Sequence, residues 1–236
     1  MFLDLHAHSA GISRCCRAPI TKVLEVAKTT GFDGIVLTNH YTRAYFAEGE
    51  EDAFTEQYIA EYEAACTCGA ALGLRVLFGM EVGMERYTPV HLLVYGITPD
   101  MLRALPTLYD MTQAELYAHV HALGGVVVQA HPFRKNKNHL LDTALLDGVE
   151  LNCHPLYKDG THRGGLCGIA ARDGLFVTCG CDYHADTHRA KAGTYLPDDI
   201  TDTIALAQYL KRANPIRLRL QEPWETDGRD FTFTRG

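Results

Sequence analysis

The chain has 236 residues, and 22 Lys and Arg against 29 Asp and Glu give it a formal net charge of −7. Its 47% hydrophobic and 22% charged residues are typical of a globular protein and exclude a disordered chain. The acidic balance argues against a broad nucleic-acid or anionic-membrane surface, which would need clustered Lys and Arg. We expect one domain over residues 1–236, with 221–236 as a peripheral C-terminal tail.

The sequence predicts neither a secretory signal nor a membrane span. Asp4 interrupts the apolar start of the chain, and the longest uncharged run, residues 116–133, is broken by several His and Gly residues. The eight cysteines form no Cys-x-x-Cys pair, which indicates reduced thiols. We therefore expect a cytoplasmic protein that contacts no membrane.

Apolar runs alternate with amphipathic segments in the first half of the chain. We predict buried strands at 2–5, 34–37, 75–78 and 90–94. Helices are predicted from residue 20 to Gly31 and from residue 51 to Gly73, since glycine commonly ends a helix. The connection between the last two strands is too short for a crossover helix, so this pair is predicted to be antiparallel or irregular.

The second half continues the alternation. Thr112 and Glu115 have capping-box spacing, which predicts a helix up to Gly124. Further strands are predicted at 126–128, 149–151, 176–178 and 216–220, and further helices at 162–173 and 201–212. No repeat or flexible linker interrupts this pattern, which indicates one α/β domain.

Polar side chains gather where the predicted strands end. In a closed α/β barrel these ends converge on one face, where such folds assemble active sites. The residues at these positions are Asp4, His6, His8, Asn39, His40, Glu81, His91, His131, Asn152, Asp182 and His184.

Imidazole and carboxylate are ligands for Zn²⁺, Mn²⁺ and Fe²⁺. Burying six or more such groups together without a cation would cost several kcal/mol. His6 and His8 share one side of an extended backbone because they are two residues apart. The pattern therefore indicates a metal centre.

The motifs resemble, in order, those of the PHP (polymerase and histidinol phosphatase) family. Asp4-Leu5-His6-Ala7-His8-Ser9 resembles its D-x-H-x-H opening, and Thr38-Asn39-His40 its second motif, which is usually Thr-Asp-His. The later matches are Gly79-Met80-Glu81, the lone His91, Ala130-His131-Pro132 and Gly180-Cys181-Asp182-Tyr183-His184. The resemblance covers about residues 1 to 220.

This resemblance implies a distorted (β/α)7 TIM-like barrel with two or three divalent ions (zinc, manganese or iron) at the strand ends. When the ligand positions of the family are transferred to the matching residues of this sequence, the resemblance implies one ion held by His6, His8, Glu81 and Asp182. It implies a second ion held by Glu81, His91 and His131, with Glu81 bridging, and a third held by His40 and His184. Members similar to this chain hydrolyse phosphate esters.

Two departures from the family pattern concern the third ion. The stretch 11–16 lacks the acid or histidine that completes this site in many members. Cys15 or Cys16 is an alternative thiolate ligand, although packing or supporting roles are favoured. Asn39 replaces the usual aspartate, which removes a charge and is expected to alter metal affinity on the His40 side.

The expected reaction is hydrolysis of a small-molecule phosphomonoester by a metal-bound hydroxide. Asp182 is the candidate proton acceptor, and Arg134 the candidate phosphate clamp, because guanidinium binds phosphate through two hydrogen bonds. Arg14, Arg43 and Asn152 are further candidates for binding substrate. The remaining histidines are expected on the surface or in loops rather than at the metals: His119, His121, His139, His154, His162 and His188.

Three alternative functions stay open. The chain is alternatively a nuclease or phosphodiesterase acting on short nucleotides, a protein-tyrosine phosphatase, or a catalytically silent metal-binding module. The net charge disfavours an extended nucleic-acid partner. Substrate, native metal, pathway and oligomeric state do not follow from the sequence.

Overall fold

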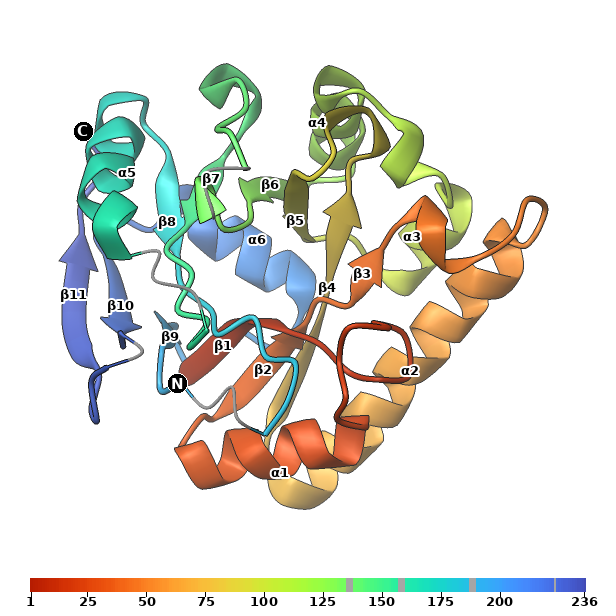
Figure 1. Ribbon diagram of the computed structural model, residues 1–236, viewed down its shortest axis with the longest axis horizontal. Helices are drawn as coiled ribbons and strands as arrows, with labels where there is room; N and C mark the ends of the chain where they lie inside the picture. The colour runs from red at the N-terminus through yellow and green to blue at the C-terminus, as the bar shows by residue number, and fades with distance from the viewer. Residues whose placement is uncertain (135–137, 157–159, 187–189, 223) are drawn as a thin grey trace.

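The frame of the molecule is one mixed sheet that curls into a nearly closed barrel (Figure 1). The computed structural model describes residues 1–134, 138–156, 160–186, 190–222 and 224–236. Seven strands form the barrel and are neighbours in chain order: β1 (Phe2–Ala7), β2 (Gly34–Leu37), β4 (Arg75–Gly83), β5 (His91–Tyr95), β6 (Val126–Gln129), β7 (Gly148–Glu150) and β8 (Phe176–Thr178). The predicted distorted (β/α)7 TIM-like barrel is thus confirmed.

The distortion of the barrel is centred on β5. β1, β2 and β4 are parallel, as are β6, β7 and β8, but β5 runs antiparallel to both of its neighbours. The short connection after β4 allows no crossover helix, so the predicted antiparallel pair is confirmed. Every residue of β1, β2, β6, β7 and β8 is buried, as expected for strands covered on both faces.

Helices pack around this sheet, and the predicted ones are confirmed with small shifts at their ends. α1 (Ile20–Thr30) and α2 (Glu51–Leu72) end at left-handed glycines, and the capping box of α4 (Gln113–Ala122) is formed. α5 (Gly160–Arg172) precedes β8, and α6 (Thr203–Arg212) packs against β4 and β5. The short α3 (Pro99–Ala104) was not predicted, because six residues carry no clear helical periodicity. The 3₁₀ turns are η1 (Arg43–Tyr45), η2 (Glu85–Tyr87), η3 (Leu108–Asp110) and η5 (Thr143–Leu145).

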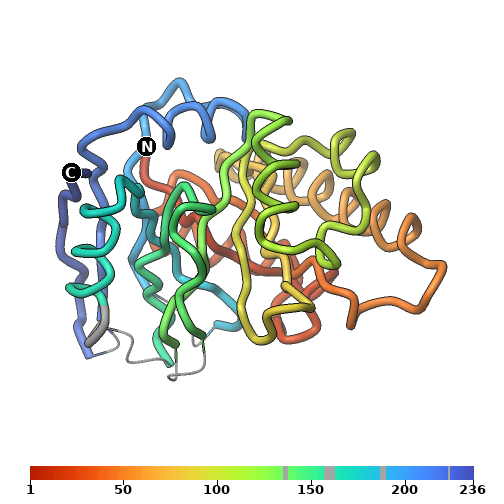
Figure 2. Tube along the Cα trace, turned by 90° about the horizontal axis from the view of Figure 1, so that it is seen from above, coloured from red at the N-terminus to blue at the C-terminus, as the bar shows by residue number. Residues whose placement is uncertain are grey.

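The C-terminal part adds antiparallel strands beside β1. β9 (Gly193–Tyr195) pairs with β1 and with the predicted strand β10 (Ile216–Leu220), and β11 (Arg229–Phe233) pairs with β10. The expected peripheral C-terminal tail contains β11, which is the edge strand of the sheet. Figure 2 shows this hairpin at one side of the molecule, next to α5. Within the described residues, no helix is long and apolar enough to cross a membrane.

The barrel closes where the segment after β8 meets β1. Tyr183 forms a parallel bridge with Ala7, and the backbone N–H of Asp182 donates to the carbonyl oxygen of His6 at 2.8 Å. Asp4 reinforces this junction, because its Oδ1 accepts from the backbone N–H groups of His6 (3.0 Å) and Cys181 (2.9 Å). Closure therefore brings the chain after β8 against the metal-ligand motif of β1.

Gly180 permits this close approach. A Cβ at this position would lie 2.5 Å from Cβ of His6 and 2.7 Å from its backbone nitrogen. Both distances are shorter than van der Waals contact, and the atoms belong to a closely packed, buried strand. Glycine therefore lets the barrel close at this place without displacing the backbone of β1.

We predict that Gly180→Ala lowers the free energy of unfolding by about 1–3 kcal/mol, because overpacking forces backbone shifts. The measurement is denaturant unfolding, with Gly165→Ala as the matched control. A Cβ at Gly165 in α5 meets nothing within 4 Å, and alanine favours helix. Equal stability of the Gly180 variant and the wild type would contradict this account of the junction.

Candidate metal centre

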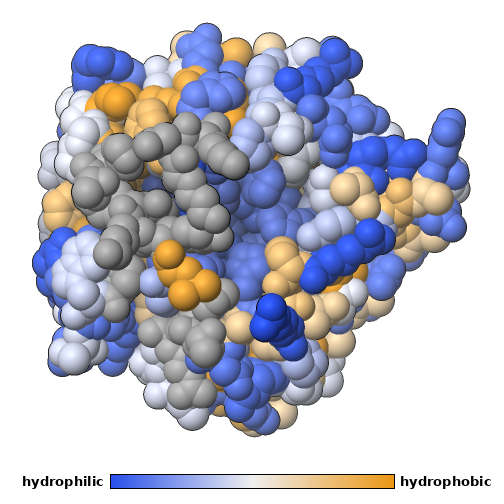
Figure 3. Space-filling model, in the orientation of Figure 1, coloured by the Kyte–Doolittle hydropathy of each residue, from blue (hydrophilic) through white to orange (hydrophobic). Residues whose placement is uncertain are grey.

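The side chains predicted to bind metal meet at one end of the barrel, where Figure 3 shows a hydrophilic hollow. His6 lies in β1, Glu81 in β4, and His40 opens the short strand β3 (His40–Tyr41), directly opposite Glu81. Because β5 is antiparallel, its first residue, His91, lies at the same end as the carboxyl end of β4. The other four follow strands: His8 after β1, His131 after β6, and Asp182 and His184 after β8.

Four of these residues form a tight group, namely His6, His8, Glu81 and Asp182, and all four are buried. Nε2 of His6 and Nε2 of His8 are 3.1 Å apart, and each is 3.3 Å from Oε2 of Glu81. Oδ1 of Asp182 lies 3.4 Å from Nε2 of His6 and 3.1 Å from Nε2 of His8. Ligand atoms on one ion with bonds of about 2.1 Å are separated by roughly 3.0–3.4 Å. The spacing therefore fits a shared cation.

Glu81 faces neighbours through both of its carboxylate oxygens. Oε1 lies 2.8 Å from Nδ1 of His91 and 2.8 Å from Nε2 of His131. Oε2 lies 2.9 Å from Nδ1 of His40, yet this fully buried atom accepts no hydrogen bond of acceptable geometry from the described residues. A buried unsatisfied carboxylate oxygen is costly, so its environment also fits a cation. His40, Glu81 and His91 form a second possible ligand group.

Hydrogen bonds at Nδ1 orient the imidazoles of His6, His8 and His184. His6 donates to Glu150 and His184 to the carbonyl oxygen of Asp182, and both acceptors fix the proton on Nδ1. The distances to Nδ1 are 2.8 Å for Glu150 Oε1, 3.0 Å for Ser13 Oγ beside His8, and 2.7 Å for Asp182 O. Such partners set the tautomer of a metal-binding histidine and direct Nε2 toward the ion.

Ser13 fixes the tautomer of His8 through Asn39. The hydroxyl of Ser13 donates to Oδ1 of Asn39 at 2.8 Å and accepts from the backbone N–H of His40 at 3.0 Å. Since its only proton is used, Ser13 must accept from Nδ1 of His8. Asn39 thus orients a neighbouring histidine indirectly, despite lacking the charge of the family aspartate.

Glu150, Ser13 and Asn138 support the candidate ligands, although the sequence did not mark them as site residues. Glu150 binds His6 through Oε1 and the backbone N–H of His131 through Oε2 at 3.0 Å, and the Asn138 amide lies 2.8 Å from Nδ1 of His131. Glu150 could have been recognised from the sequence, because it lies inside the predicted buried strand at 149–151 and a buried carboxylate needs hydrogen-bond or charged partners. Ser13 and Asn138 lie in loops and gave no such signal.

The backbone is strained at two of the candidate ligands. His131 has φ 32° and Asp182 has φ 53°, in the left-handed region that non-glycine residues rarely adopt. Each such residue costs about 1–3 kcal/mol and persists only where the surroundings enforce it. Here the backbone N–H of His131 donates to Glu150, and that of Asp182 donates to the carbonyl oxygen of His6. These hydrogen bonds hold the two turns that direct the side chains inward.

The carboxylates of the cluster are ionised. Burial opposes the charge of Glu81, but His40 and His91 and other histidines outweigh it and hold the pKa of this carboxyl well below its usual range. Burial likewise opposes ionisation of Asp182, yet His6 and Arg134 hold its pKa well below the usual range. The pocket therefore carries fixed negative charge that favours a cation.

The histidines divide into two groups. Burial lowers the pKa of His40 to about 4 and that of His184 to about 3, so both rings are neutral at pH 7, as metal ligands must be. Burial also disfavours the charged form of His6, but Glu150 and Asp182 with other carboxylates raise its pKa well above the usual range. Positive charge is thus most strongly stabilised beside His6.

Arg134 and Asn152, for which a role in substrate binding was predicted, lie beside the cluster. Nη1 of Arg134 is 2.6 Å from Oδ2 of Asp182, and Nη2 donates to Oδ1 of Asn152. The amide of Asn152 in turn donates to Oε2 of Glu150 at 3.0 Å. A guanidinium is therefore held at the mouth of the cluster by a candidate metal ligand.

Arg14 and Arg43 are placed differently. Arg14 stacks on the ring of Tyr45 at 5.0 Å and donates to the carbonyl oxygens of Ala44 and Tyr45. Arg43 stacks on Phe46 at 5.1 Å and donates to its carbonyl oxygen. The contacts described for both guanidinium groups are with the segment 44–46, so the structure does not bring them to the metal ligands.

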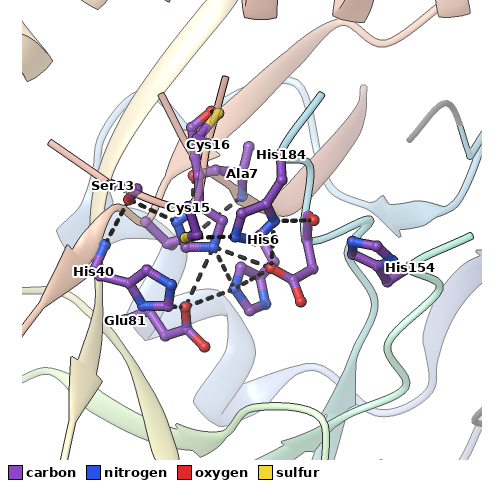
Figure 4. Close-up of polar contacts among 12 residues, drawn as sticks. His6, Ala7, Ser13, Cys15, Cys16, His40, Glu81, His154 and His184 are labelled. Atoms are coloured by element: carbon purple, nitrogen blue, oxygen red, sulfur yellow. Dashed lines mark hydrogen bonds and ion pairs between the residues drawn. The ribbon is translucent and has the colours of Figure 1, made fainter. Parts of the chain in front are cut away.

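The remaining histidines mostly lie away from the cluster. His119 is exposed on α4, and His121 binds Asp147 at 2.9 Å. His154, however, is buried, and its ring lies 5.9 Å from that of His184 (Figure 4), so it belongs to the surroundings of the cluster. His188 and the side chain of His162 lie outside the described residues.

Solved structures identify the fold. No protein-family model and no curated protein matches the sequence. A protein from Bifidobacterium adolescentis, assigned as a metal-dependent phosphoesterase, is 20% identical with a TM-score of 0.55, over 89% of this chain and 96% of its own. PsfC from Pseudomonas syringae is 17% identical with a TM-score of 0.62, over 100% of this chain and 91% of its own.

A two-domain protein from Bacteroides vulgatus, assigned as containing a PHP-like metal-dependent phosphoesterase, is 14% identical with a TM-score of 0.57. The match covers 93% of this chain but 58% of that protein. This chain shares the fold of these three proteins. An amidohydrolase from Chromobacterium violaceum has a similar fold, at 16% identity and a TM-score of 0.54 over 83% of this chain and 92% of its own. The fold therefore does not decide which bond is hydrolysed.

We predict that Glu150→Gln lowers metal affinity about 10–100-fold, as is typical when a residue supporting a ligand is removed. The glutamine amide would place a donor where Glu150 now accepts three hydrogen bonds, from His6, His131 and Asn152. The measurement is competitive titration with a chelator. Glu115→Gln, the same change in the exposed capping box of α4, is the control and should leave the affinity unchanged. Wild-type affinity in a folded Glu150 variant would remove this role.

Proposed function

We propose that this chain is a metal-dependent phosphoesterase that hydrolyses a small-molecule phosphomonoester, with two or three divalent ions of zinc, manganese or iron. The observation that carries the proposal is the pairing of Arg134 with Asp182 at 2.6 Å. It puts an anion-binding guanidinium directly beside a buried group of imidazoles and carboxylates. A phosphate ester needs both features.

The proposed ligands follow from the spacing of the side chains. His6, His8, Glu81 and Asp182 would hold one ion, because their ligand atoms lie within 4.8 Å of one another. Oε1 of Glu81, with His91 and His131 each at 2.8 Å, would face a second ion, as the family resemblance implies. His40, 2.9 Å from Oε2, lies between this group and His184.

Ions bound there would lower the pKa of bound water and neutralise charge on the phosphate. Arg134 is held beside the cluster by hydrogen bonds to Asp182 and Asn152, and it would turn from Asp182 to bind the phosphate oxygens. As the guanidinium turned to the substrate, Oδ2 of Asp182 would lose its partner and could accept a proton while Oδ1 stayed with the histidines. The amide of Asn152 would help to fix Arg134.

A phosphomonoester is favoured over a nucleic acid because the net charge of −7 repels an extended polyanion. A cation at the cluster mouth still attracts a small anion, since the attraction acts at short range where solvent screens little. Arg14 does not contact a proposed ligand, but Tyr45, on which it stacks, lies 6.0 Å from the ring of His40. It stays a candidate for the distal part of a substrate.

Hydrolysis of an aryl phosphate that depends on added divalent metal is the expected outcome of the direct test. The same assay should include a phosphodiester, a phosphotyrosine peptide and an aryl amide, which represent the competing activities. Asp182→Ala and His131→Ala should abolish turnover and lower bound metal. A metal-loaded protein that turns over none of these compounds would indicate the silent binding module, and cleavage of the amide alone would indicate an amidohydrolase.

Arg134→Ala should raise KM for the aryl phosphate about 10–100-fold, which corresponds to losing a charged hydrogen bond of roughly 1.5–3 kcal/mol. Bound metal, measured on the same sample, should stay close to the wild-type amount. The matched control is Arg217→Ala on β10, where the guanidinium pairs with Asp230 on the sheet edge. An unchanged KM would exclude Arg134 from the phosphate site.

A further inference from the structure

Cys15 lies at the outer edge of the metal-ligand cluster, beside His184. Its Sγ is 3.1 Å from Nε2 of His184, and Figure 4 shows the two side chains pointing toward one another. The carbonyl oxygen of Asp182 holds Nδ1 of His184 at 2.7 Å, so the ring presents Nε2 to the sulfur. Cys15 is exposed, so an ion can reach it from solvent.

His184, which contacts Cys15, also belongs to a group of three histidines. Ligand nitrogens of His8, His40 and His184 lie within 4.8 Å of one another, which makes them a possible ion-binding group. The ring of His8 lies 4.3 Å from that of His184 and 4.6 Å from that of His40. Nε2 of His8 also faces Glu81 and Asp182, so this ring borders both ligand groups.

Cys16 is placed differently. It is 5% exposed, and its Sγ contacts the backbone carbonyl oxygens of His8 and Ala18 at 3.5 and 3.7 Å. These contacts are packing within the loop. The structure therefore separates two adjacent cysteines that the sequence left equivalent.

We propose that Cys15 supplies a thiolate ligand to a divalent cation that it holds together with His40 and His184. The inference rests on the proposed metal-dependent function and adds a ligand of different chemistry to it. Two ligands of a tetrahedral zinc ion, one nitrogen and one sulfur, are separated by about 3.6 Å. The observed 3.1 Å lies close to this value, and a small rotation of the exposed side chain makes up the difference.

The ligand type determines which ions this place prefers. A thiolate with imidazoles favours zinc, cobalt or iron over manganese or magnesium. Binding forms the metal–sulfur bond and releases the thiol proton to solvent. Cys15 thus takes the role of the acid or histidine that the stretch 11–16 lacks. Its thiolate makes this edge of the cluster selective for softer ions.

Titration of the full chain with Co²⁺ tests the proposal by absorption rather than by turnover. The wild type should show visible d–d bands and also a near-ultraviolet thiolate-to-cobalt charge-transfer band. Cys15→Ser should keep the d–d bands, lose the charge-transfer band, and bind one zinc equivalent fewer. Cys16→Ser is the matched control and should behave as the wild type.

The possible outcomes separate this inference from the proposed function. Absence of all cobalt bands in the folded wild type overturns the metal-dependent function itself. Visible bands without a charge-transfer band, or a charge-transfer band that persists in Cys15→Ser, overturn only the role of Cys15. A test without any variant is alkylation of the wild-type protein, in which zinc should slow modification of Cys15 about tenfold or more; equal rates with and without zinc overturn the proposal.

Discussion

The buried carboxylate of Glu81 is the constraint on which the centre depends. Both of its oxygens are removed from solvent, and they face five imidazoles, those of His6, His8, His40, His91 and His131. Burying such a charge costs several kcal/mol unless positive charge or donors surround it. The rings come from strands or strand ends distributed around the sheet, so the carboxylate is tolerated only because the barrel curls these ends together.

Closure of the barrel therefore determines where the candidate ligands lie. The segment after β8 can lie against β1 because Gly180 leaves room for Cβ of His6, and this contact places Asp182 3.1 Å from His8. The left-handed backbone at His131 and Asp182 shows that local preference is overridden at the ligands themselves. Strain concentrated at a binding site is expected where the remaining structure determines the geometry.

The chemistry at this end of the barrel is set by the side chains rather than by the fold. Proteins described as a metal-dependent phosphoesterase and as an amidohydrolase share this fold. The proposed action on a phosphate ester rests on the guanidinium of Arg134, held between Asp182 and Asn152 at the mouth of the cluster. A neutral amide substrate would offer this guanidinium no anionic group to bind.

The sequence by itself determined the longer helices, the seven barrel strands and the candidate ligands, because apolar periodicity and polar residues at strand ends are local signals. Only the tertiary structure decided which groups support those ligands, which arginine lies at the cluster, and which of two adjacent cysteines faces it. It also revealed elements that the sequence did not predict, namely β3, β9, β11 and α3. The same holds for three residues that support the ligands: Ser13, Asn138 and Glu150. These features depend on contacts between residues far apart in the chain, and a side chain's direction in a loop follows from what packs against it rather than from its neighbours in sequence.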